Sequence, residues 1–384
     1  MTLRYALVYL LAWLKVRGNK LQMADYLNKK GYPQRARSVF RQGLAENGWD
    51  QIRQQLQATT GQTISDDRIV FHGGAQNLGF ITHNNKYISK IMADRDSFMR
   101  ERYFYQHVID HCDDDDPVLK PLYISDDKDP LMCITLPLVE GDDRQYLEVF
   151  DHVMQARSFL KKLADRLPGK TAALHVPKPA LSKNMSDERF FRKIKLWQLF
   201  ANIDQPDVKP HIEKLLAYAN RLAEEKDLPQ ALKQDILHIN RQLLEQGFIP
   251  ADPARFCFTH GDLKSANFLG KPDEGILIDW GRASFLPVGY DLATMLSKAK
   301  LSHKEVEAVL AGYFEGLDAE QQLSLLACYL HCLKDIFSKD MPAAKKPERV
   351  AGFISYYRKK LEQSQGKTAV FGVFCLVSML AVDI

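Results

Sequence analysis

Thr259-His260-Gly261-Asp262-Leu263-Lys264-Ser265-Ala266-Asn267-Phe268-Leu269, followed by Gly275-Ile276-Leu277-Ile278-Asp279-Trp280-Gly281-Arg282, is the stretch of sequence that decides the fold. Asp262 and Asn267 are five residues apart, so a loop can turn their side chains in different directions. Asp279 ends the apolar run 276–278, which is typical of a strand, and a strand end holds a side chain rigidly. We therefore expect these three oxygen-bearing side chains to converge.

These residue types fit the transfer of a phosphoryl group from ATP. The transfer needs a carboxylate that orients the attacking hydroxyl and accepts its proton, and oxygen ligands that hold Mg²⁺ on the phosphates. We expect Asp262 to accept the proton and Asn267 and Asp279 to bind the metal, with Asn267 also counted as catalytic. Lys264 is expected to neutralise charge on the transferring group.

The order of these motifs resembles the catalytic and metal-binding loops of the aminoglycoside phosphotransferase and choline kinase superfamily, small-molecule relatives of protein kinases. The matching elements are His260-Gly261-Asp262, Asn267, Ile278-Asp279 and Asp291-Leu292-Ala293. A lone His-Gly-Asp is a weak signal, but these elements in this order are specific. The resemblance covers about residues 65 to 300 and implies a phosphotransferase that uses ATP and Mg²⁺ and has an alcohol group as acceptor.

The resemblance also implies nucleotide-binding residues upstream. A Gly-rich turn covers the phosphates, a strand lysine pairs with them, a glutamate on the next helix holds the lysine, and a hinge offers backbone hydrogen bonds to adenine. The residues in these places are Gly73, Gly74, Gly79, Lys90, Glu101 and Val139. Glu101 can instead pair with Arg100 or Arg102 on the surface, and the turn lacks a clear Gly-x-Gly-x-x-Gly.

The hydrophobic pattern predicts a small β-rich lobe joined to a larger, mostly helical one, and the resemblance implies that they form an α+β, bilobal, protein-kinase-like fold with the nucleotide site in the small lobe and the acceptor pocket in the large one. Residues 1–60 read as a helical N-terminal appendage. Short β-type runs, with a hairpin turn at Asn84-Asn85, predict a small antiparallel-sheet lobe for nucleotide binding over 61–141. Residues 142–384 predict a larger, mostly helical lobe with the acceptor pocket, the catalytic and metal loops and the C-terminal helices.

Charge and hydropathy set limits on partners. The net charge of +4 over 384 residues gives no field that favours nucleic acid. The span from Lys15 to Arg41 holds eight basic residues and only one acid. It forms either a solvated helix face or a segment that is attracted to an anionic surface or substrate. The apolar runs 5–14 and 368–382 are too short to span a bilayer. We favour packing of these runs against the protein over an anchor at the membrane interface.

The cysteines indicate a reducing compartment. The six cysteines are scattered, and only Cys328 and Cys332 lie close together, which predicts a reducing, cytoplasmic setting. We expect the protein to be in solution or peripheral to the inner face of the membrane, and no obligate protein partner is evident from the sequence. Cys328, His331 and Cys332 have a helical spacing that a metal site can use, but no second cluster completes it and core packing is favoured. The run Asp113 to Asp116 predicts a solvated loop rather than a metal site.

Two other functions compete with a small-molecule phosphotransferase. A protein Ser/Thr kinase places a long activation segment ending in Ala-Pro-Glu after the metal aspartate, but here eleven residues separate Asp279 from Asp291. A silent nucleotide-binding pseudokinase usually lacks a catalytic residue, and none is missing here. The acceptor stays open, because segment 146–247 mixes acids and bases. Sugars, aminoglycosides, amino alcohols and envelope- or lipid-linked saccharides are all compatible.

Overall fold

The computed structural model divides the chain into two compact units, Met1–Gln145 with Ala266–Ala283 (unit 1), and Tyr146–Ser265 with Ser284–Ile384 (unit 2). The residues that the structure describes are 3–16, 18–71, 77–126, 128–139, 159, 162, 163, 166, 186–203, 205, 207–246, 256–264, 267–269, 275–287, 290, 291, 293, 294, 304, 319–337 and 350–362.

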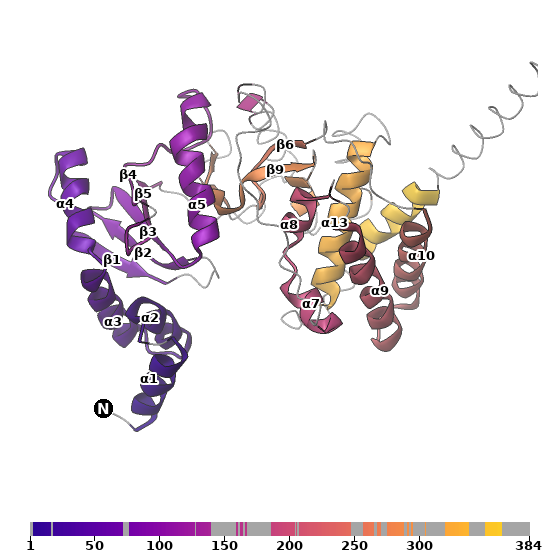
Figure 1. Ribbon diagram of the computed structural model, residues 1–384, viewed down its shortest axis with the longest axis horizontal. Helices are drawn as coiled ribbons and strands as arrows, with labels where there is room; N and C mark the ends of the chain where they lie inside the picture. The colour runs from indigo at the N-terminus through magenta and orange to yellow at the C-terminus, as the bar shows by residue number, and fades with distance from the viewer. Residues whose placement is uncertain are drawn as a thin grey trace, which may run out of the picture. The chain divides into compact units, whose positions relative to one another are not determined.

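A five-stranded antiparallel sheet lies at the centre of unit 1 (Figure 1). The strands are β1 (Asp66–Val70), β2 (Asn77–His83), β3 (Tyr87–Met92), β4 (Tyr123–Ile124) and β5 (Cys133–Pro137), in the order β1-β2-β3-β5-β4. The hairpin between β2 and β3 turns at Asn84 and Asn85, whose φ angles of 52° and 51° are tolerated by asparagine and match a hairpin turn. The hairpin predicted at these residues is confirmed.

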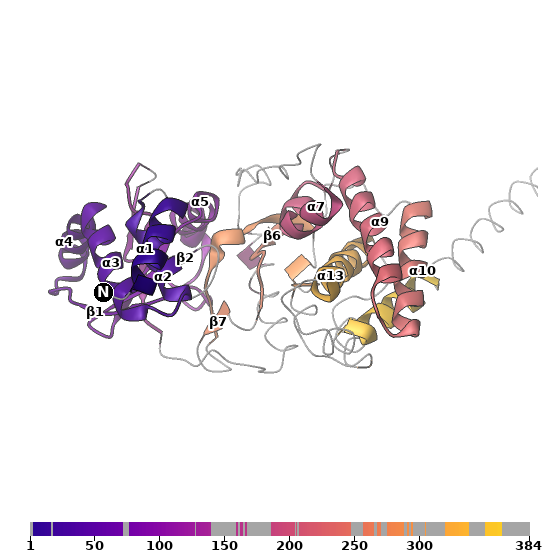
Figure 2. The same cartoon turned by 90° about the horizontal axis from the view of Figure 1, so that it is seen from below.

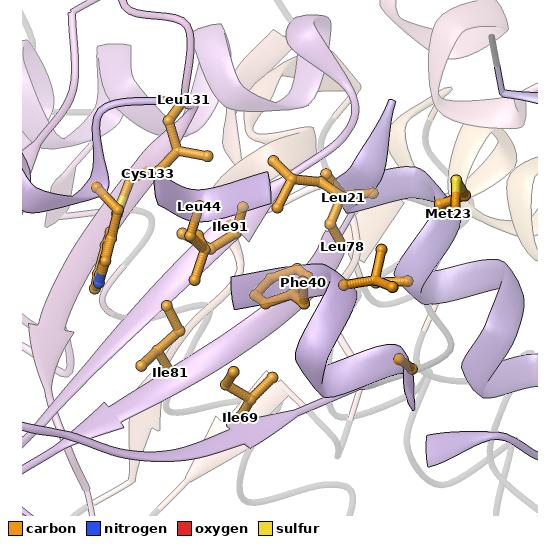
Figure 3. Close-up of a cluster of buried hydrophobic side chains, with 14 of the residues drawn as sticks. Leu21, Met23, Phe40, Leu44, Ile69, Leu78, Ile81, Ile91, Leu131 and Cys133 are labelled. Carbon is orange, nitrogen blue, oxygen red and sulfur yellow. The ribbon is translucent and has the colours of Figure 1, made fainter. Parts of the chain in front are cut away.

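The N-terminal helices α2 (Lys20–Lys29), α3 (Pro33–Glu46) and α4 (Trp49–Thr60) cover one face of the sheet, and α1 (Leu3–Lys15) packs on α2. Side chains alternate between the faces of a strand, so Ile81 and Ile91 point to this side while Lys90 points to the other. Phe40 and Leu44 of α3 pack against the isoleucines (Figure 3). Helices and sheet therefore share one core, and the domain boundary expected near residue 60 does not separate two cores.

Two expectations about the N-terminal part were wrong. Gly79 lies inside β2 rather than in a phosphate-covering turn, and a Cβ there would come within 3.1 Å of the Phe40 ring, so close packing explains this glycine. The run 5–14 packs on the protein through Ala12, Val8 and Tyr9, but it does not bury its leucine stripe. The exposed side chains of this run are those of Leu7, Leu10, Leu11, Trp13 and Leu14. α2 and α3 pack side by side, and α1 packs on α2 (Figures 1 and 2).

The other face of the sheet carries Lys90 toward α5 (Arg95–Tyr103). Asp94 caps this helix by accepting a hydrogen bond from the Ser97 N–H, and the chain continues as the π-helical turn η1 (Phe104–Val108) and the short η2 (Ile109–His111). The hairpin of β7 (Phe268–Leu269) and β8 (Ile276–Leu277), followed by η6 (Trp280–Arg282), also belongs to unit 1. The loop expected to bind the metal was placed in the larger lobe by the sequence, whereas the structure groups it with unit 1.

The described part of unit 2 is mostly helical, with a two-stranded sheet of β6 (Phe256–Thr259) and β9 (Ser284–Pro287). Its helices include α7 (Asp187–Lys193), α8 (Leu196–Ala201), α9 (Lys209–Glu225), α10 (Gln230–Gln246) and α13 (Ala319–Phe337), and residues 350–362 are helical. The Tyr329 hydroxyl donates to Asn240 Oδ1 at 2.7 Å and ties α13 to α10. The antiparallel sheet and these helices confirm the α+β class.

The sequence clusters considered as metal sites do not form one within the described part of the chain. Cys328 and Cys332 are buried in α13, and His331 Nε2 lies 3.3 Å from the hydroxyl of Tyr290. Asp114 pairs with Lys120 in an exposed loop. No helix among the described residues is both long and apolar enough to span a membrane, and the run 368–382 lies outside the described residues.

Candidate active site

Lys90 is the most constrained charge in unit 1. Its ammonium donates to Glu101 Oε2 and to Asp279 Oδ1, each at 2.6 Å, and both Lys90 and Glu101 are buried. Burial alone lowers the pKa of a lysine, but Asp279 and Glu101 outweigh it and raise the pKa of Lys90. The structure thus brings three predicted residues together around one permanent positive charge, and Arg102 pairs with Asp126 instead.

Asp279 lies in a conformation that few non-glycine residues adopt. Its φ of 68° and ψ of 58° are left-handed, and such backbone is found where the surroundings hold it in place. Trp280 supplies that support, because its fully buried indole stacks on the ring of Phe104 with centroids 3.9 Å apart and planes 6° apart. Helix α5 and its continuation therefore hold both Glu101 and the loop that carries Asp279.

Asn267 lies beside the segment that carries Asp279. Its backbone carbonyl accepts a hydrogen bond from the Ile278 N–H at 3.0 Å, and the residue is 4% exposed. A side-chain amide oxygen and a carboxylate are hard oxygen donors, the type that Mg²⁺ prefers. The donor set of Asn267 and Asp279 therefore fits a magnesium ion.

The loop that carries Asp262 belongs to unit 2 and begins where β6 ends. Gly261 has a φ of 77°, which favours glycine, and this turn points the N–H groups of His260 and Gly261 toward Asp291. Asp291 accepts them at its Oδ2 and Oδ1, both at 2.8 Å, and is buried. Burial raises the pKa of Asp291 although His260 and the two N–H groups act to lower it. A buried carboxylate thus braces the loop.

The structure gives Asp291 a role that sequence reasoning did not assign. The motif Asp291-Leu292-Ala293 was recognised from the resemblance, but its contact with residues 260 and 261 is thirty residues away in sequence and leaves no local pattern. Thr259 adds a second tie, because its hydroxyl donates to the Ser284 carbonyl of β9 at 3.0 Å. The backbone of the catalytic loop is fixed on both sides.

Asp262 itself is buried and pairs with Lys264, whose ammonium lies 2.9 Å from Asp262 Oδ2. The Asp262 N–H also donates to His260 Nδ1 at 3.3 Å. The side chain of Lys264 is 35% exposed, so it reaches from solvent onto the carboxylate. The two predicted catalytic residues of this loop are therefore in direct contact.

Some predicted nucleotide-binding residues are less defined. Gly73 and Gly74 lie outside the described residues, as do Glu140 and Gly141 of the expected hinge. Val139 is described and half-buried, two residues after the end of β5. Only a few residues between 146 and 185 are described, so most of the expected acceptor segment also lies outside them.

Residues 67–326 match the model of a family described as the phosphotransferase enzyme family. This chain belongs to the phosphotransferase enzyme family. The match spans more than half of the sequence and runs from β1 into α13, leaving α1 to α4 outside it. It confirms the resemblance seen in the motifs around Asp262 and Asp279, and with it a small-molecule phosphotransferase that acts on hydroxyl groups.

Solved structures of aminoglycoside-type enzymes also resemble this member of the phosphotransferase enzyme family. Wild-type aminoglycoside 2′-phosphotransferase-IIIa with GDP has 14% identity and a TM-score of 0.43, covering 82% of this chain and 98% of that chain. Spectinomycin phosphotransferase with ADP and spectinomycin has 14% and 0.47, covering 82% and 98%. The streptomycin–ATP ternary complex of APH(2″)-IIa has 15% and 0.42, covering 82% and 95%. No curated protein matches. Because these values are low, the assignment rests on the family match.

Proposed function

We propose that this protein transfers the γ-phosphoryl group of ATP to a hydroxyl group of a small molecule, with Mg²⁺ bound by Asn267 and Asp279. The observation that carries the proposal is the buried ammonium of Lys90 held by Glu101 and Asp279 at 2.6 Å each. A buried ion cluster is often no more stable than apolar residues of the same size, so it is better explained by function. A fixed cation beside a metal-type carboxylate suits a triphosphate.

Each residue has a role in this scheme. Lys90 binds phosphate oxygens while Glu101 keeps its ammonium in place. Asp262 orients the acceptor hydroxyl and takes its proton as the oxygen–phosphorus bond forms, and the bond to the β–γ bridging oxygen breaks with its electron pair leaving on ADP. A bound magnesium ion neutralises charge on the phosphates. The order of Asp262, Asn267 and Asp279 in the chain supports their action on one nucleotide.

Lys264 supplies a second cation, on the loop of Asp262. In the structure it pairs with the carboxylate, which lowers the electrostatic cost of a buried Asp262 before the substrate binds. Its half-exposed side chain can leave Asp262 for the negatively charged group in flight. Lys264 therefore serves the carboxylate first and the phosphoryl group afterwards.

The acceptor is proposed to be a hydroxyl of a sugar, an aminoglycoside or an amino alcohol. A lipid-linked saccharide is the second candidate, and the excess of basic residues between Lys15 and Arg41 favours it. ATP as donor and the free cysteines of the described part, Cys112, Cys133, Cys328 and Cys332, suit the cytoplasm. The eleven residues between Asp279 and Asp291 leave little room for a peptide platform, so a protein acceptor is disfavoured.

A screen of ATP consumption tests the proposal. The purified protein is incubated with ATP and kanamycin, spectinomycin, choline, glucose or a lipid-linked disaccharide, with magnesium or with EDTA. We expect one acceptor to accelerate ADP release over ATP alone, with full loss in EDTA, and Mg-ATP to bind by calorimetry. The absence of Mg-ATP binding contradicts the proposal. Phosphate transfer to myelin basic protein, and to none of the small molecules, supports the protein kinase instead, and binding without any turnover supports a pseudokinase.

A further inference from the structure

Helix α1 presents a continuous apolar face to solvent. Leu7, Leu10, Leu11 and Leu14 are 57%, 52%, 47% and 58% exposed, and Trp13 beside them is 50% exposed. The spacing of the four leucines by three and four residues places them on one side of a helix. Exposed large apolar residues are ordinary when scattered, but five on one helix mark an interaction surface.

The opposite side of α1 is attached to the protein. Ala12 is fully buried, and Val8, Tyr9 and Val16 are partly buried against the core of α2, α3 and the sheet. The helix ends at Lys15, and in the turn that follows the Gly18 N–H donates to the Trp13 carbonyl at 3.1 Å. Helix α1 therefore has two apolar sides: one packs on the protein, and the other, which carries the leucines, faces solvent.

We propose that the apolar face of α1 docks on the surface of an anionic lipid membrane. The helix is 13 residues long, or about 20 Å at 1.5 Å per residue, which is too short to cross a bilayer of about 30 Å. A helix with a leucine face and a tryptophan instead lies in the plane of the interface, with its apolar side chains at the boundary of headgroups and acyl chains. Trp13 has the side chain that is enriched at this boundary.

Charge complementarity favours an anionic surface as the occupant. The span from Lys15, the last residue of α1, to Arg41 holds eight basic residues with one acid, Asp25. Lys29 pairs with Asp25 and Lys20 with Glu46. The exposed Lys30, Arg37 and Arg41 make no ion pair within the described part of the chain. Basic segments next to an interfacial helix add attraction to anionic lipids, which falls with salt.

The same charges oppose a second copy of this chain as the occupant. A symmetric contact through α1 would place the same patch of both copies together and so bring their basic segments side by side. Like charges in close contact disfavour such a pairing. A membrane rich in anionic lipid meets the apolar face and the basic segment at once.

The proposed docking face leaves the nucleotide side of unit 1 uncovered. α2 to α4 cover the sheet face that carries Ile81 and Ile91, and α1 packs on α2, whereas Lys90 points to the face of α5. The family match begins at residue 67, so α1 lies outside the part that defines the phosphotransferase. Docking through α1 is therefore independent of the proposed reaction and compatible with any acceptor.

Vesicle co-sedimentation of the full-length protein tests this proposal. We expect binding to vesicles of phosphatidylcholine with phosphatidylglycerol, weaker binding to phosphatidylcholine alone, and a loss of about tenfold or more in Leu10→Glu/Leu14→Glu. Leu244→Glu is the matched control, because Leu244 is an exposed leucine of α10 in unit 2, and it should bind like the wild type. Lys30→Gln/Arg37→Gln/Arg41→Gln should weaken binding at low salt and bring it close to the high-salt value of the wild type.

The outcomes separate docking from catalysis. Binding that survives Leu10→Glu/Leu14→Glu, or no binding to anionic vesicles, overturns the proposal. A dimer in solution that this double variant converts to a monomer also overturns it and assigns the face to a second copy. ATP turnover without vesicles should be the same in the double variant and the wild type, so a failure of docking leaves the proposed phosphotransferase function standing.

Discussion

Two lysine–aspartate pairs of this chain differ in how firmly they are held. In unit 1, Lys90 lies between Asp279 and Glu101, with its side chain 8% exposed and both contacts at 2.6 Å. In unit 2, Lys264 has the single partner Asp262 within the described part of the chain, at 2.9 Å, and is 35% exposed. One lysine is held by two carboxylates in a buried site, whereas the other extends from solvent to one.

Burial and the number of carboxylate partners decide whether the lysine of such a pair stays fixed or can move. Withdrawing Lys90 would leave the buried carboxylate of Glu101 and the partly buried carboxylate of Asp279 without their cation, so Lys90 behaves as part of the framework. Withdrawing Lys264 costs less, because its side chain is 35% exposed and its ammonium regains water when it leaves Asp262, so it is able to move during a reaction. We therefore interpret Lys90 and Asp279 as a fixed nucleotide and metal site, and Lys264 and Asp262 as the pair that changes partners.

Lys90→Met is expected to have the largest effect. It breaks a buried ion cluster and should lower the free energy of unfolding by about 3–5 kcal/mol, with loss of Mg-ATP binding. The raised pKa of Lys90 means that its contribution is full below its ordinary pKa and lost only as the pH rises through the higher folded value, so the loss should be constant from neutral to mildly alkaline pH. Urea unfolding measures it, with Lys264→Met as the matched control. Equal losses in the two variants would remove the contrast.

Lys264→Ala is expected to have the second-largest effect, a fall in the rate of phosphoryl transfer. If the lysine stabilises the group in transfer, kcat falls by about 100-fold, or about 2.7 kcal/mol, while the free energy of unfolding changes by less than about 1 kcal/mol. Steady-state kinetics with the acceptor from the screen, and urea unfolding, provide the two values. An unchanged kcat would limit Lys264 to neutralising Asp262 in the resting protein.

Asp291→Asn tests the support of the catalytic loop. The amide offers one oxygen where the carboxylate accepts two N–H groups, so a loss of about 1–3 kcal/mol in stability is expected, with a lower kcat. The pKa of Asp291 is raised, so the wild type loses stability from this group as pH rises from its ordinary pKa of about 4 through the folded value. The Asp291→Asn variant lacks that decline. Unfolding at acid and neutral pH measures how the free energy of unfolding changes with pH in the wild type and in the variant. Parallel slopes would contradict the assignment.

Tyr105→Phe should have the smallest effect and the opposite sign. The Tyr105 hydroxyl and Glu101 Oε1 are buried and make no hydrogen bond within the described part of the chain. Removing a buried hydroxyl without a partner should raise the free energy of unfolding by about 1 kcal/mol. Destabilisation in urea would indicate that the hydroxyl supports Glu101 in the fixed pair.

The sequence was sufficient to predict the residues of both pairs, and the pairing of Lys90 with Glu101, but not the contact of either lysine with an aspartate. Asp262 and Asp279 were predicted from local motifs, and Lys90 and Glu101 from the expected order of strand and helix. Whether a lysine is clamped or exposed depends on contacts far away in sequence, because Lys90 and Asp279 are 189 residues apart. No pattern in a single segment carries that information.

The same reason explains the other differences in the fold. The stacking of Trp280 on Phe104 joins the metal loop to unit 1, and neither residue predicts the other from its neighbours. The strand β4 has two residues, which is too short for a periodic signal. The leucine stripe of α1 was predicted as a helix face, but its exposure depends on which side of the helix is docked, and both sides are apolar.

Asp262→Asn tests most directly whether Asp262 is the proton acceptor. Two quantities are measured in this variant and in the wild type: kcat for phosphoryl transfer, and the Kd for Mg-ATP by calorimetry. Removal of the proton acceptor alone predicts a fall in kcat of about 10²- to 10⁴-fold and a nearly unchanged Kd. If Asp279 binds the metal beside Lys90, Asp279→Ala should instead raise the Kd for Mg-ATP. Ordinary turnover in Asp262→Asn would contradict the catalytic assignment.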